Sequence, residues 1–379
     1  MADTSLADTE GGPALSPVIV TGGCGFIGYH IIVEILRHET DCKIHVIDID
    51  TQRNRIAGVE YHNCDISSLS QVEQVFAQAQ PKTIFHVACP ESTVQQPAIF
   101  KKVNVTGAQN LLIAAKEIGT VRAFINTSTS SVIHDNVTDL VKADENLPVL
   151  QYPAQKRVYT LTKAEAETEI LAANRQNGDS SMLTVSMRPA TVFGERDTIT
   201  FGKIVANARQ GKGKIQFGPG KNLYDFVYAS NCADAHILAA KALLRAWGKS
   251  PPPPDKRVDG ESFNITNEES VPFWDFQRAI AASVGLPVKP EEIKILPIWV
   301  AYLIATIAEW FTWIRTFGKD QPIVTREAVR LTVIERTLSG EKAKRVLGYH
   351  PKVTMDEGLA RTGKWFVDEE QKCGTKKTI

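Results

Sequence analysis

Two tyrosine–lysine pairs, each with a spacing of four residues, could move a proton. They are Tyr152–Lys156 and Tyr159–Lys163. A spacing of four places both side chains on one face of a helix, where the lysine ammonium favours the ionised tyrosine and lowers its pKa toward neutrality. Such a tyrosine can accept the proton of an alcohol while a hydride leaves the same carbon. The pattern therefore predicts the oxidation of an alcohol.

The second pair is the better candidate. Pro153 follows Tyr152 directly and lies near the start of a helix predicted over residues 153–174, where proline is tolerated. Tyr152 therefore lies at or before the first turn and need not share a helical face with its lysine. Tyr159 and Lys163 lie inside the helix, and we predict that they carry the chemistry. If either pair is considered alone, the alternative to a catalytic role is that its two side chains are simply exposed on a helix.

A run of five hydroxyl side chains, Thr127–Ser131, follows a strand predicted over residues 123–127. A hydroxyl group from this run could donate a hydrogen bond to the oxygen that reacts. The run therefore supplies the second half of the predicted catalytic site.

Three glycines, Gly22, Gly25 and Gly28, follow the first predicted strand, and the third lies in the first turn of the first predicted helix. In this spacing the first glycine allows the tight turn, the second lets the backbone approach a pyrophosphate, and the third lets the helix pack on the strand. Phe26 and Ile27 open the helix, whose unpaired N–H groups and positive dipole end favour phosphates. The pattern predicts a dinucleotide site, and a glycine-rich turn without a ligand is the alternative.

Asp48 ends the second predicted strand, 20 residues after Gly28. A carboxylate at this place accepts hydrogen bonds from the adenosine ribose hydroxyls and repels a 2′-phosphate. Ile49, and not an arginine, comes next, so we expect NAD rather than NADP. Arg53 and Arg55 lie close enough in the sequence to leave NADP open, and a solvated strand end is the alternative for Asp48.

Short β-rich runs alternate with helical stretches through the first half of the chain. Predicted strands cover residues 17–21, 43–48, 60–64, 83–88, 123–127 and 183–188, and predicted helices cover residues 26–37, 69–79, 97–118 and 153–174. This alternation predicts an α/β fold: a Rossmann-type, doubly wound parallel sheet with a smaller C-terminal substrate-binding region. Asp65 and Ile66 follow the third strand, where they could reach the adenine.

The alternation weakens after residue 195, and this sets the predicted domain boundaries. We expect a flexible tail at residues 1–15, an NAD-binding domain at 16–195 to which 221–247 returns, a substrate-binding region at 196–220 and 260–370, and a basic tail at 371–379.

Composition excludes other classes of protein. The 43 Lys and Arg residues equal the 43 Asp and Glu residues in number, which argues against a nucleic-acid partner. The six cysteines form no C-x-x-C pair, so we expect no metal site. The N-terminal residues contain no long apolar run, so we expect no signal peptide.

An apolar segment covers residues 295–317 in the C-terminal third. Its first 14 residues, Ile295–Ala308, carry no charge, which is short of the roughly 18 residues that span a bilayer. Trp310 and Trp313 follow Glu309, and such aromatic residues are typical of a membrane interface. We predict that the segment covers a hydrophobic substrate pocket and touches a membrane without crossing it, and a buried helix is the alternative.

The motifs together resemble those of the extended short-chain dehydrogenase/reductases. More narrowly, they resemble the 3β-hydroxysteroid dehydrogenase family, and within it the fungal sterol-4α-carboxylate 3-dehydrogenases (decarboxylating). The resemblance covers residues 17–240, with a weaker match beyond them. It rests on the stretches VTGGCGFIGYHI, STSSVIHDNVTDLVKADENLPV, QYPAQKRVYTLTKAEAE, MRPATVFGERD and NLYDFVYASNCADAH.

The resemblance assigns roles residue by residue. It implies Tyr159 as the base, and Lys163 as the residue that also holds the nicotinamide ribose. The catalytic hydroxyl falls on Thr129, where family members carry serine, and Ser128 is the second choice. Further cofactor contacts are implied for Ala88, Thr127, Pro189, Ala190 and Val192.

The implied function is the NAD-dependent oxidation of the 3β-hydroxyl of a sterol or triterpenoid to a 3-ketone, with loss of a C4 carboxylate as CO2. The departure at Thr129 leaves open the same chemistry on a fungal secondary-metabolite terpenoid or meroterpenoid. A nucleotide-sugar epimerase or reductase is another alternative, because a glycine-rich loop at 211–220 could bind a diphosphate. The apolar C-terminal third argues against it. A dinucleotide sensor without catalytic activity is a third alternative, and the intact Tyr159–Lys163 pair argues against it.

The same resemblance implies partners and a location. We expect a hydrophobic small molecule and a membrane surface as partners, and a homodimer is left open. Residues 376–379 resemble a dilysine retrieval signal of the endoplasmic reticulum, and a plain basic tail is the alternative. We expect a peripheral protein on the cytosolic face of the endoplasmic reticulum membrane, with a cytoplasmic location as the alternative.

Overall fold

A large parallel sheet forms the centre of the protein. The structure is a computed structural model that describes residues 12–91, 96–317, 322 and 324–375. In these residues seven parallel strands follow the order β11-β7-β5-β4-β1-β2-β3. The order runs outward from β1 in two directions, which confirms the predicted doubly wound fold. The strands are β1 (Val18–Thr21), β2 (Ile44–Asp48), β3 (Glu60–Asn63), β4 (Thr83–His86), β5 (Ala123–Thr127), β7 (Leu183–Pro189) and β11 (Glu261–Ile265).

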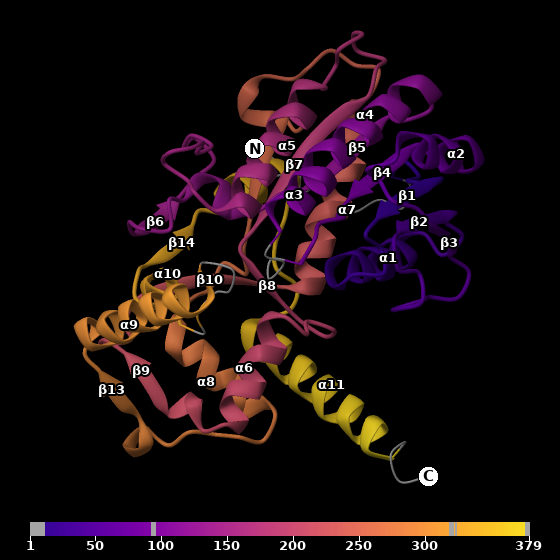
Figure 1. Cartoon of the computed structure of the whole chain (residues 1–379). Coiled ribbons are helices and arrows are strands. Elements are labelled where there is room, and N and C mark those ends of the chain that lie inside the picture. The colour runs from indigo at the N-terminus through magenta and orange to yellow at the C-terminus, as the bar shows by residue number, and fades with distance from the viewer. Residues whose placement is uncertain (1–11, 92–95, 318–321, 323, 376–379) are drawn as a thin grey trace, which may run out of the picture.

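Helices cover both faces of this sheet (Figure 1). One face carries α1 and α7, and the other carries α2, α4 and α5. The central strands are buried on both faces, as a parallel sheet between two helical layers requires. These helices are α1 (Phe26–His38), α2 (Leu69–Ala79), α4 (Gly107–Ile118), α5 (Val158–Ala172) and α7 (Ala229–Ala246).

Two predicted helices differ from the observed ones. The helix predicted at 97–118 is divided into α3 (Pro97–Phe100), a π-helical turn (Lys101–Thr106) and α4. The helix predicted at 153–174 begins only at Val158.

The buried side chain of Gln155 accounts for the late start of α5. Its amide donates to the His134 carbonyl (2.5 Å) and accepts from the N–H groups of Lys156 and Arg157 (both 2.8 Å). These bonds satisfy backbone groups in a non-helical arrangement and so compete with a first helical turn. The contact with His134 is non-local and leaves no trace in helical periodicity.

Smaller sheets and an aromatic core lie to the left of the large sheet and below it in Figure 1. One sheet has the order β12-β10-β14-β6, with β8 also paired to β10, and β9 pairs with β13. Phe226 stacks on Phe276 in the core, with ring centroids 3.6 Å apart. The elements are β6 (Leu140–Ala143), β8 (Thr191–Phe193), α6 (Thr200–Arg209), β9 (Ile215–Phe217), β10 (Leu223–Tyr228), β12 (Ser270–Pro272), α8 (Phe273–Ser283), β13 (Lys294–Leu296), β14 (Arg336–Leu338) and α11 (Met355–Thr375).

Some segments lie differently from the predicted boundaries. Residues 1–11 and 376–379 are outside the described residues, but Leu15 is buried and its N–H donates to the Glu39 carboxylate (2.9 Å). The described part of α11 reaches Thr375, and β11 belongs to the large sheet although it falls within 260–370. β11 joins the large sheet because it pairs with β7, a strand far from it in the sequence, and completes the backbone hydrogen bonds of β7. The division into domains stays a prediction.

Two helices, α9 (Ile298–Thr316) and α10 (Arg326–Leu331), lie at one end of the molecule (Figure 1). Ala301 and Ala305 of α9 are buried and form a small cluster with Val329 of α10. Within the described ranges, every helix is too short or too polar to span a membrane.

Candidate active site

The turn between β1 and α1 requires glycine at the predicted positions. Gly22 has a φ of +68°, and a Cβ there would lie 2.7 Å from the Ala88 Cα. A Cβ on Gly28 would lie 2.2 Å from the Gly22 carbonyl oxygen, so α1 can approach the turn only without a side chain there. No side chain caps α1 at Gly25. The N–H groups of its first turn are therefore left for an anion, which fits the pyrophosphate of a dinucleotide.

Phe26 and Ile27 open α1 and use their side chains for packing. Ile27 packs against the main hydrophobic core, and the Phe26 ring lies edge-on to His30 with centroids 5.6 Å apart. Their backbone N–H groups are thus the parts that could contact a phosphate.

Asp48 ends β2 next to this turn. Its carboxylate accepts hydrogen bonds from the N–H groups of Cys24 (3.1 Å) and Asp50 (3.2 Å). These bonds hold the carboxylate against the glycine turn, which is the position that a partner of the adenosine ribose needs.

Asp65 and Ile66 lie after β3, and both already have partners in the protein. Asp65 pairs with Lys102 (2.9 Å). Ile66 is buried against Gly107, where a Cβ would lie 2.6 Å from its Cδ1. Their contact with an adenine stays a prediction.

The other residues predicted to bind the cofactor lie along one edge of the large sheet. Because its strands are parallel, their carboxyl ends meet at this edge, outside which ligands bind in such folds. Ala88 follows β4, Thr127 ends β5 and Pro189 ends β7, with Ala190 and Val192 directly after it. The fold thus brings these residues to the same edge as the glycine turn.

Tyr159 and Lys163 lie in the first turns of α5 at this edge. The Lys163 ammonium is buried and donates to the carbonyl of Thr127 (2.9 Å). Tyr159 is partly buried and shares a hydrogen bond with Thr129. Tyr152 precedes α5 and is 74% exposed. The structure therefore brings together the pair and the hydroxyl run predicted for catalysis, and leaves the other tyrosine at the surface.

The electrostatics of Tyr159 differ from the prediction. Burial raises the pKa of its hydroxyl far above the ordinary value, and the hydrogen bond with Thr129 and the charges of Arg157 and Arg336 oppose this rise only in part. The sequence predicted that the pKa of Tyr159 falls toward neutrality. This prediction is wrong for the protein without a bound ligand. The spacing of the two residues indicated a nearby lysine, but it could not indicate that the tyrosine hydroxyl is buried. In addition, the Lys163 ammonium donates its hydrogen bond to a backbone carbonyl and not to Tyr159.

Thr129 and Ser128 can be compared by their contacts. The Thr129 hydroxyl accepts from the Ser131 N–H (3.2 Å) and bonds with Tyr159. The Ser128 hydroxyl is buried and finds no hydrogen-bond partner among the described residues. The geometry favours Thr129 as the hydroxyl that shares a ligand with Tyr159.

A buried pair at the same edge was not predicted. The Thr21 hydroxyl lies 2.9 Å from His86 Nδ1 and accepts from the Ala88 N–H (3.2 Å). Burial, together with the charge of Lys163, lowers the pKa of His86 to about 3, so the ring is neutral. The signal in the sequence is a threonine directly before the first glycine of the turn and a histidine that ends a neighbouring strand.

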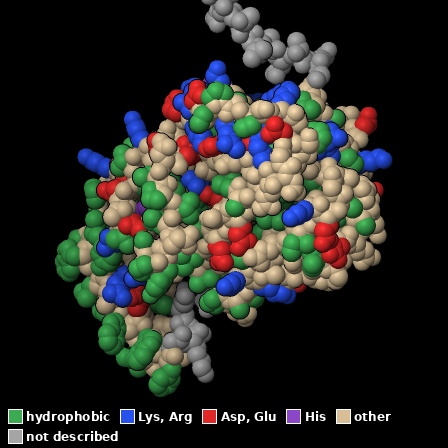
Figure 2. All heavy atoms as spheres, turned by 90° about the horizontal axis from the view of Figure 1, so that it is seen from above, with side chains coloured by type: hydrophobic (Ala, Val, Ile, Leu, Met, Phe, Trp, Pro, Cys, Tyr) green, Lys and Arg blue, Asp and Glu red, His purple; other side chains and the backbone are tan. Residues whose placement is uncertain are grey.

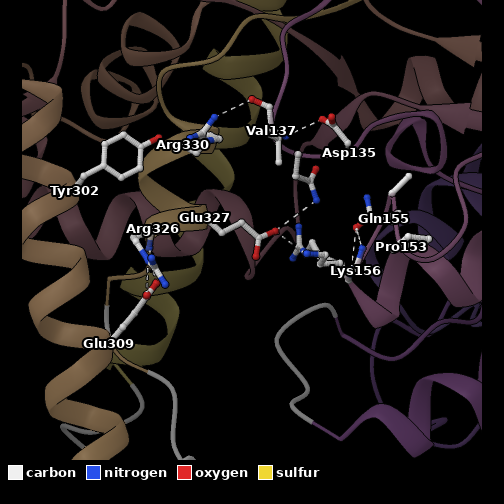
Figure 3. Close-up of a pocket in the computed structure, with 13 residues that line it drawn as sticks. Asp135, Val137, Pro153, Gln155, Lys156, Tyr302, Glu309, Arg326, Glu327 and Arg330 are labelled. Carbon is white, nitrogen blue, oxygen red and sulfur yellow. Dashed lines mark hydrogen bonds and ion pairs between the residues drawn. The ribbon is translucent and has the colours of Figure 1, made fainter.

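A cavity of about 840 Å³ opens beside the start of α5 (Figure 3). Loops at residues 135–137 and 153–157 form one wall, and α9 and α10 form the other. Tyr302 and Glu309 belong to α9, so the segment predicted to cover a substrate pocket does line a cavity. Its role as a cover stays a prediction.

Two ion pairs join charged side chains that line this cavity (Figure 3). Arg157 lies 3.5 Å from Glu327, and Arg326 lies 2.6 Å from Glu309. The second of these ion pairs joins α9, which carries Glu309, to α10, which carries Arg326.

Comparison with known proteins gives consistent matches. A profile of the 3-beta hydroxysteroid dehydrogenase/isomerase family matches residues 19–296. A 3beta-hydroxysteroid-dehydrogenase/decarboxylase (isoform 2) of Arabidopsis thaliana is 34% identical over 91% of the chain, which spans only 61% of that protein. A decarboxylating sterol-4-alpha-carboxylate 3-dehydrogenase of Saccharomyces cerevisiae is 32% identical over 93% of the chain and 98% of that protein.

Solved structures share the architecture. The UDP-glucose 4-epimerase of Thermotoga maritima, solved with UDP-glucose, has a TM-score of 0.69 and 22% identity, over 93% of this chain and 99% of the other. At this level of identity the likeness shows a common fold, and function must be argued from the site.

Proposed function

Because the chain belongs to the 3-beta hydroxysteroid dehydrogenase/isomerase family, we propose that it oxidises the 3β-hydroxyl of a sterol or triterpenoid to a 3-ketone and releases a C4 carboxylate as CO2. The observation that carries this proposal is the grouping of Tyr159, Thr129 and Lys163 beside a glycine turn that fits a dinucleotide. Relatives with 32–34% identity whose names specify this reaction support it.

The residues of the chain divide the oxidation step between them. Thr129 and Tyr159 hold the alcohol oxygen, and Tyr159 accepts its proton as the C3–H bond breaks and the C=O bond forms. A bound oxidised nicotinamide supplies the acceptor for the hydride. Lys163 holds the end of β5 through Thr127 and fixes the start of the hydroxyl run.

The second step follows from the ketone. A carboxylate at C4 is β to the new carbonyl, so its C–C bond can break with the electron pair passing into an enolate. CO2 leaves, and C4 then takes a proton. A hydrogen-bond donor at the C3 oxygen stabilises the enolate, and the Thr129 hydroxyl and the protonated Tyr159 stand in that position.

We assign NAD rather than NADP as the preferred cofactor. Asp48 lies against the glycine turn, and Ile49 beside it is exposed and carries no charge. The two nearby arginines are engaged elsewhere: Arg53 pairs with Asp50 (2.9 Å), and Arg55 lies 4.5 Å from the centre of a tyrosine ring. A 2′-phosphate would therefore meet a carboxylate without a free cation.

We also propose that α9 docks on a membrane surface, at the cytosolic face of the endoplasmic reticulum. Its exposed side chains form an apolar patch, and Figure 2 shows hydrophobic side chains gathered at that end of the molecule. The patch consists of Trp299, Leu303, Ile304, Ile307, Trp310, Phe311, Trp313 and Ile314. A lipid-soluble substrate could then enter from the membrane beside the cavity.

The test of the proposed function is incubation of the purified protein with NAD or NADP and a panel of substrates, with products identified by mass. The panel contains 3β-hydroxy sterols and triterpenoids, each with and without a 4α-carboxylate, and a terpenoid or meroterpenoid of fungal secondary metabolism. We expect 3-ketones with NAD, and loss of CO2 from the carboxylated members. If none of the panel is oxidised and a nucleotide sugar given in its place is converted, the epimerase alternative replaces this proposal.

A further inference from the structure

Three side chains that can bind a metal meet on the two outermost strands at one end of the large sheet. His45 belongs to β2, and Glu60 and His62 belong to β3, which is the last strand of the order. His45 and Glu60 are direct partners in the register of the two strands, and His62 is two residues after Glu60. All three side chains therefore lie on the same face of the sheet.

The nitrogen and oxygen atoms of this cluster converge. His45 Nδ1 lies 3.1 Å from His62 Nε2 and 3.4 Å from a carboxylate oxygen of Glu60. The three ligand atoms all lie within 4.8 Å of one another. Ligand atoms that are each about 2.0–2.1 Å from a tetrahedral Zn²⁺ ion lie about 3.3 Å apart. The separations thus match three ligands around one zinc ion, whose fourth position is left for water.

The three side chains differ in how firmly they are held. His45 is buried, on the face of β2 that also carries Ile47 of the core beneath α2 and α4. The partly buried His62 ring stacks on the His45 ring, with centroids 5.3 Å apart and an angle of 24° between the planes. The Glu60 side chain is 70% exposed. Packing therefore fixes the two imidazoles, while the carboxylate is free to close around an ion.

The carboxylate of this cluster is not neutralised by a basic side chain. In the part of the chain that the structure describes, no lysine or arginine nitrogen lies within 4.0 Å of the Glu60 carboxylate, and His45 is the group that it contacts. Two imidazoles and one carboxylate are ligands that zinc takes in proteins, whereas Mg²⁺ and Ca²⁺ prefer oxygen ligands alone. The ligand types therefore favour zinc.

A second group of possible ligands in the described residues provides a contrast. It lies between α1 and α7 and consists of Glu34, His38 and Asp234. Arg37 pairs with Glu34 (3.1 Å), and Lys352 pairs with Asp234 (2.6 Å). Cations of the protein already neutralise both carboxylates there, so a metal ion would have to displace them. The cluster on β2 and β3 has no such competitor at its carboxylate.

We propose that His45, Glu60 and His62 bind one Zn²⁺ ion, which fastens the edge strand β3 to β2. This inference goes beyond the proposed function and does not depend on it. β3 pairs with a neighbouring strand on one side only, so a metal bridge adds a constraint where the sheet has fewest. Because the unfolded chain does not hold the three ligands together, zinc binding stabilises the folded protein.

The spacing of cysteines could not reveal this cluster. It contains no cysteine, and its two histidines are 17 residues apart on different strands. The register of β2 and β3 brings them together. The expectation of no metal site rested on the cysteines and did not consider these residues.

The test is the binding of Zn²⁺ to the purified full-length protein after treatment with a chelator. We expect titration calorimetry to show one zinc ion per chain. The midpoint of thermal unfolding should rise by about 2–5 °C at a zinc concentration about 100 times Kd. Mg²⁺ at the same concentration should leave the midpoint unchanged. Co²⁺ bound in place of zinc should give the visible absorption of a tetrahedral site.

Variants locate the bound ion. His62→Asn and Glu60→Gln each remove one ligand and keep a polar side chain. Their affinity for zinc should fall by more than about tenfold, because even the loss of an outer-shell partner costs roughly 10- to 100-fold. His38→Asn, in the cluster whose carboxylates are already paired, is the matched control and should bind zinc as the unmodified protein does. Glu60→Gln changes an exposed side chain, so it tests the site even if His62→Asn does not fold.

Three results would overturn the site: no zinc binding by the unmodified protein, undiminished binding in His62→Asn and Glu60→Gln, or an equal loss in His38→Asn. The two rings would then be a hydrogen-bonded pair only. Zinc binding at the cluster without a rise in the unfolding midpoint would overturn its role in fastening β3 to β2. None of these measurements uses a sterol, so they are independent of the test of the proposed function.

Discussion

Tyr159 must meet two conditions that oppose each other. In the proposed reaction it must lie in a site dry enough to hold an apolar alcohol, yet burial raises the pKa of the hydroxyl group that is proposed to accept the proton. Thr129 and the two arginines, Arg157 and Arg336, lower that pKa from three positions around the ring. The reactivity of this tyrosine is therefore set by several segments of the chain, and not by its lysine alone.

Replacing Tyr159 by Phe should abolish turnover and leave dinucleotide binding intact, because only the hydroxyl is lost. We expect kcat to fall by about 10²- to 10⁴-fold, the usual contribution of a general base. The measurement is steady-state turnover together with NAD titration by fluorescence or calorimetry. Tyr152→Phe is the matched control, since that side chain is exposed and outside α5. A dead Tyr152 variant beside an active Tyr159 variant would reverse the assignment.

The pH dependence follows from the direction of the same pKa. A base whose pKa lies above its ordinary value is mostly protonated at neutral pH, so oxidation should accelerate as pH rises through the neutral and mildly alkaline range. In Thr129→Val the hydrogen bond that lowers the pKa is lost, and the rise should move to higher pH. Profiles of kcat against pH for the two proteins check this. An unmoved profile in the valine variant means that Thr129 does not act on Tyr159.

Local patterns predicted some of these residues and could not predict others. The glycines and the Tyr159–Lys163 pair were visible because the residues that act together are close in sequence. Arg336 and Ser131 are 205 residues apart, so no spacing rule connects them. The high pKa of Tyr159 was missed for the same reason, because the groups that bury it come from other elements.

At the scale of elements, periodicity predicted the large sheet and failed where tertiary contacts decide. The strands and most helices of the first half have the expected bounds to within a few residues. The start of α5 was missed because Gln155 is held by His134. β6 and β14 contain four and three residues, too few to show a pattern, and only their pairing across the chain defines them.

The apolar patch on α9 makes a prediction of its own. A double substitution of Trp310 and Trp313 by Ser should reduce the fraction of protein that floats with vesicles of phosphatidylcholine and phosphatidylserine, because both rings are more than half exposed. The oxidation of a substrate presented in detergent should persist. Ile113→Ser is the matched control, since Ile113 is also an exposed apolar residue but lies on α4. Equal flotation of all three proteins would exclude α9 as the membrane contact, and a change in oligomeric state without a change in flotation would assign the patch to a second copy of the chain.

At the scale of the whole molecule, the candidate site combines residues from two parts of the fold, the large sheet and the C-terminal elements. The parallel sheet brings the glycine turn, Asp48 and the hydroxyl run to its carboxyl end. The C-terminal elements bring Arg336 from β14, together with the cavity wall of α9 and α10. The first contribution was predictable because alternating strands and helices allow few topologies. The contribution of the C-terminal elements was not predictable, because these short elements are defined by their contacts with other parts of the chain.

The most direct test of the central claim is to measure both products of one turnover. The purified protein is given NAD and a 4α-carboxy-3β-hydroxysterol labelled with ¹³C in the carboxyl group, and NADH and ¹³CO2 are followed together. We predict that the two form in equal amounts, and that neither forms in Tyr159→Phe, because the ketone must exist before the carboxylate can leave. NADH without ¹³CO2, or ¹³CO2 without NADH, would contradict the coupled oxidation and decarboxylation proposed for this site.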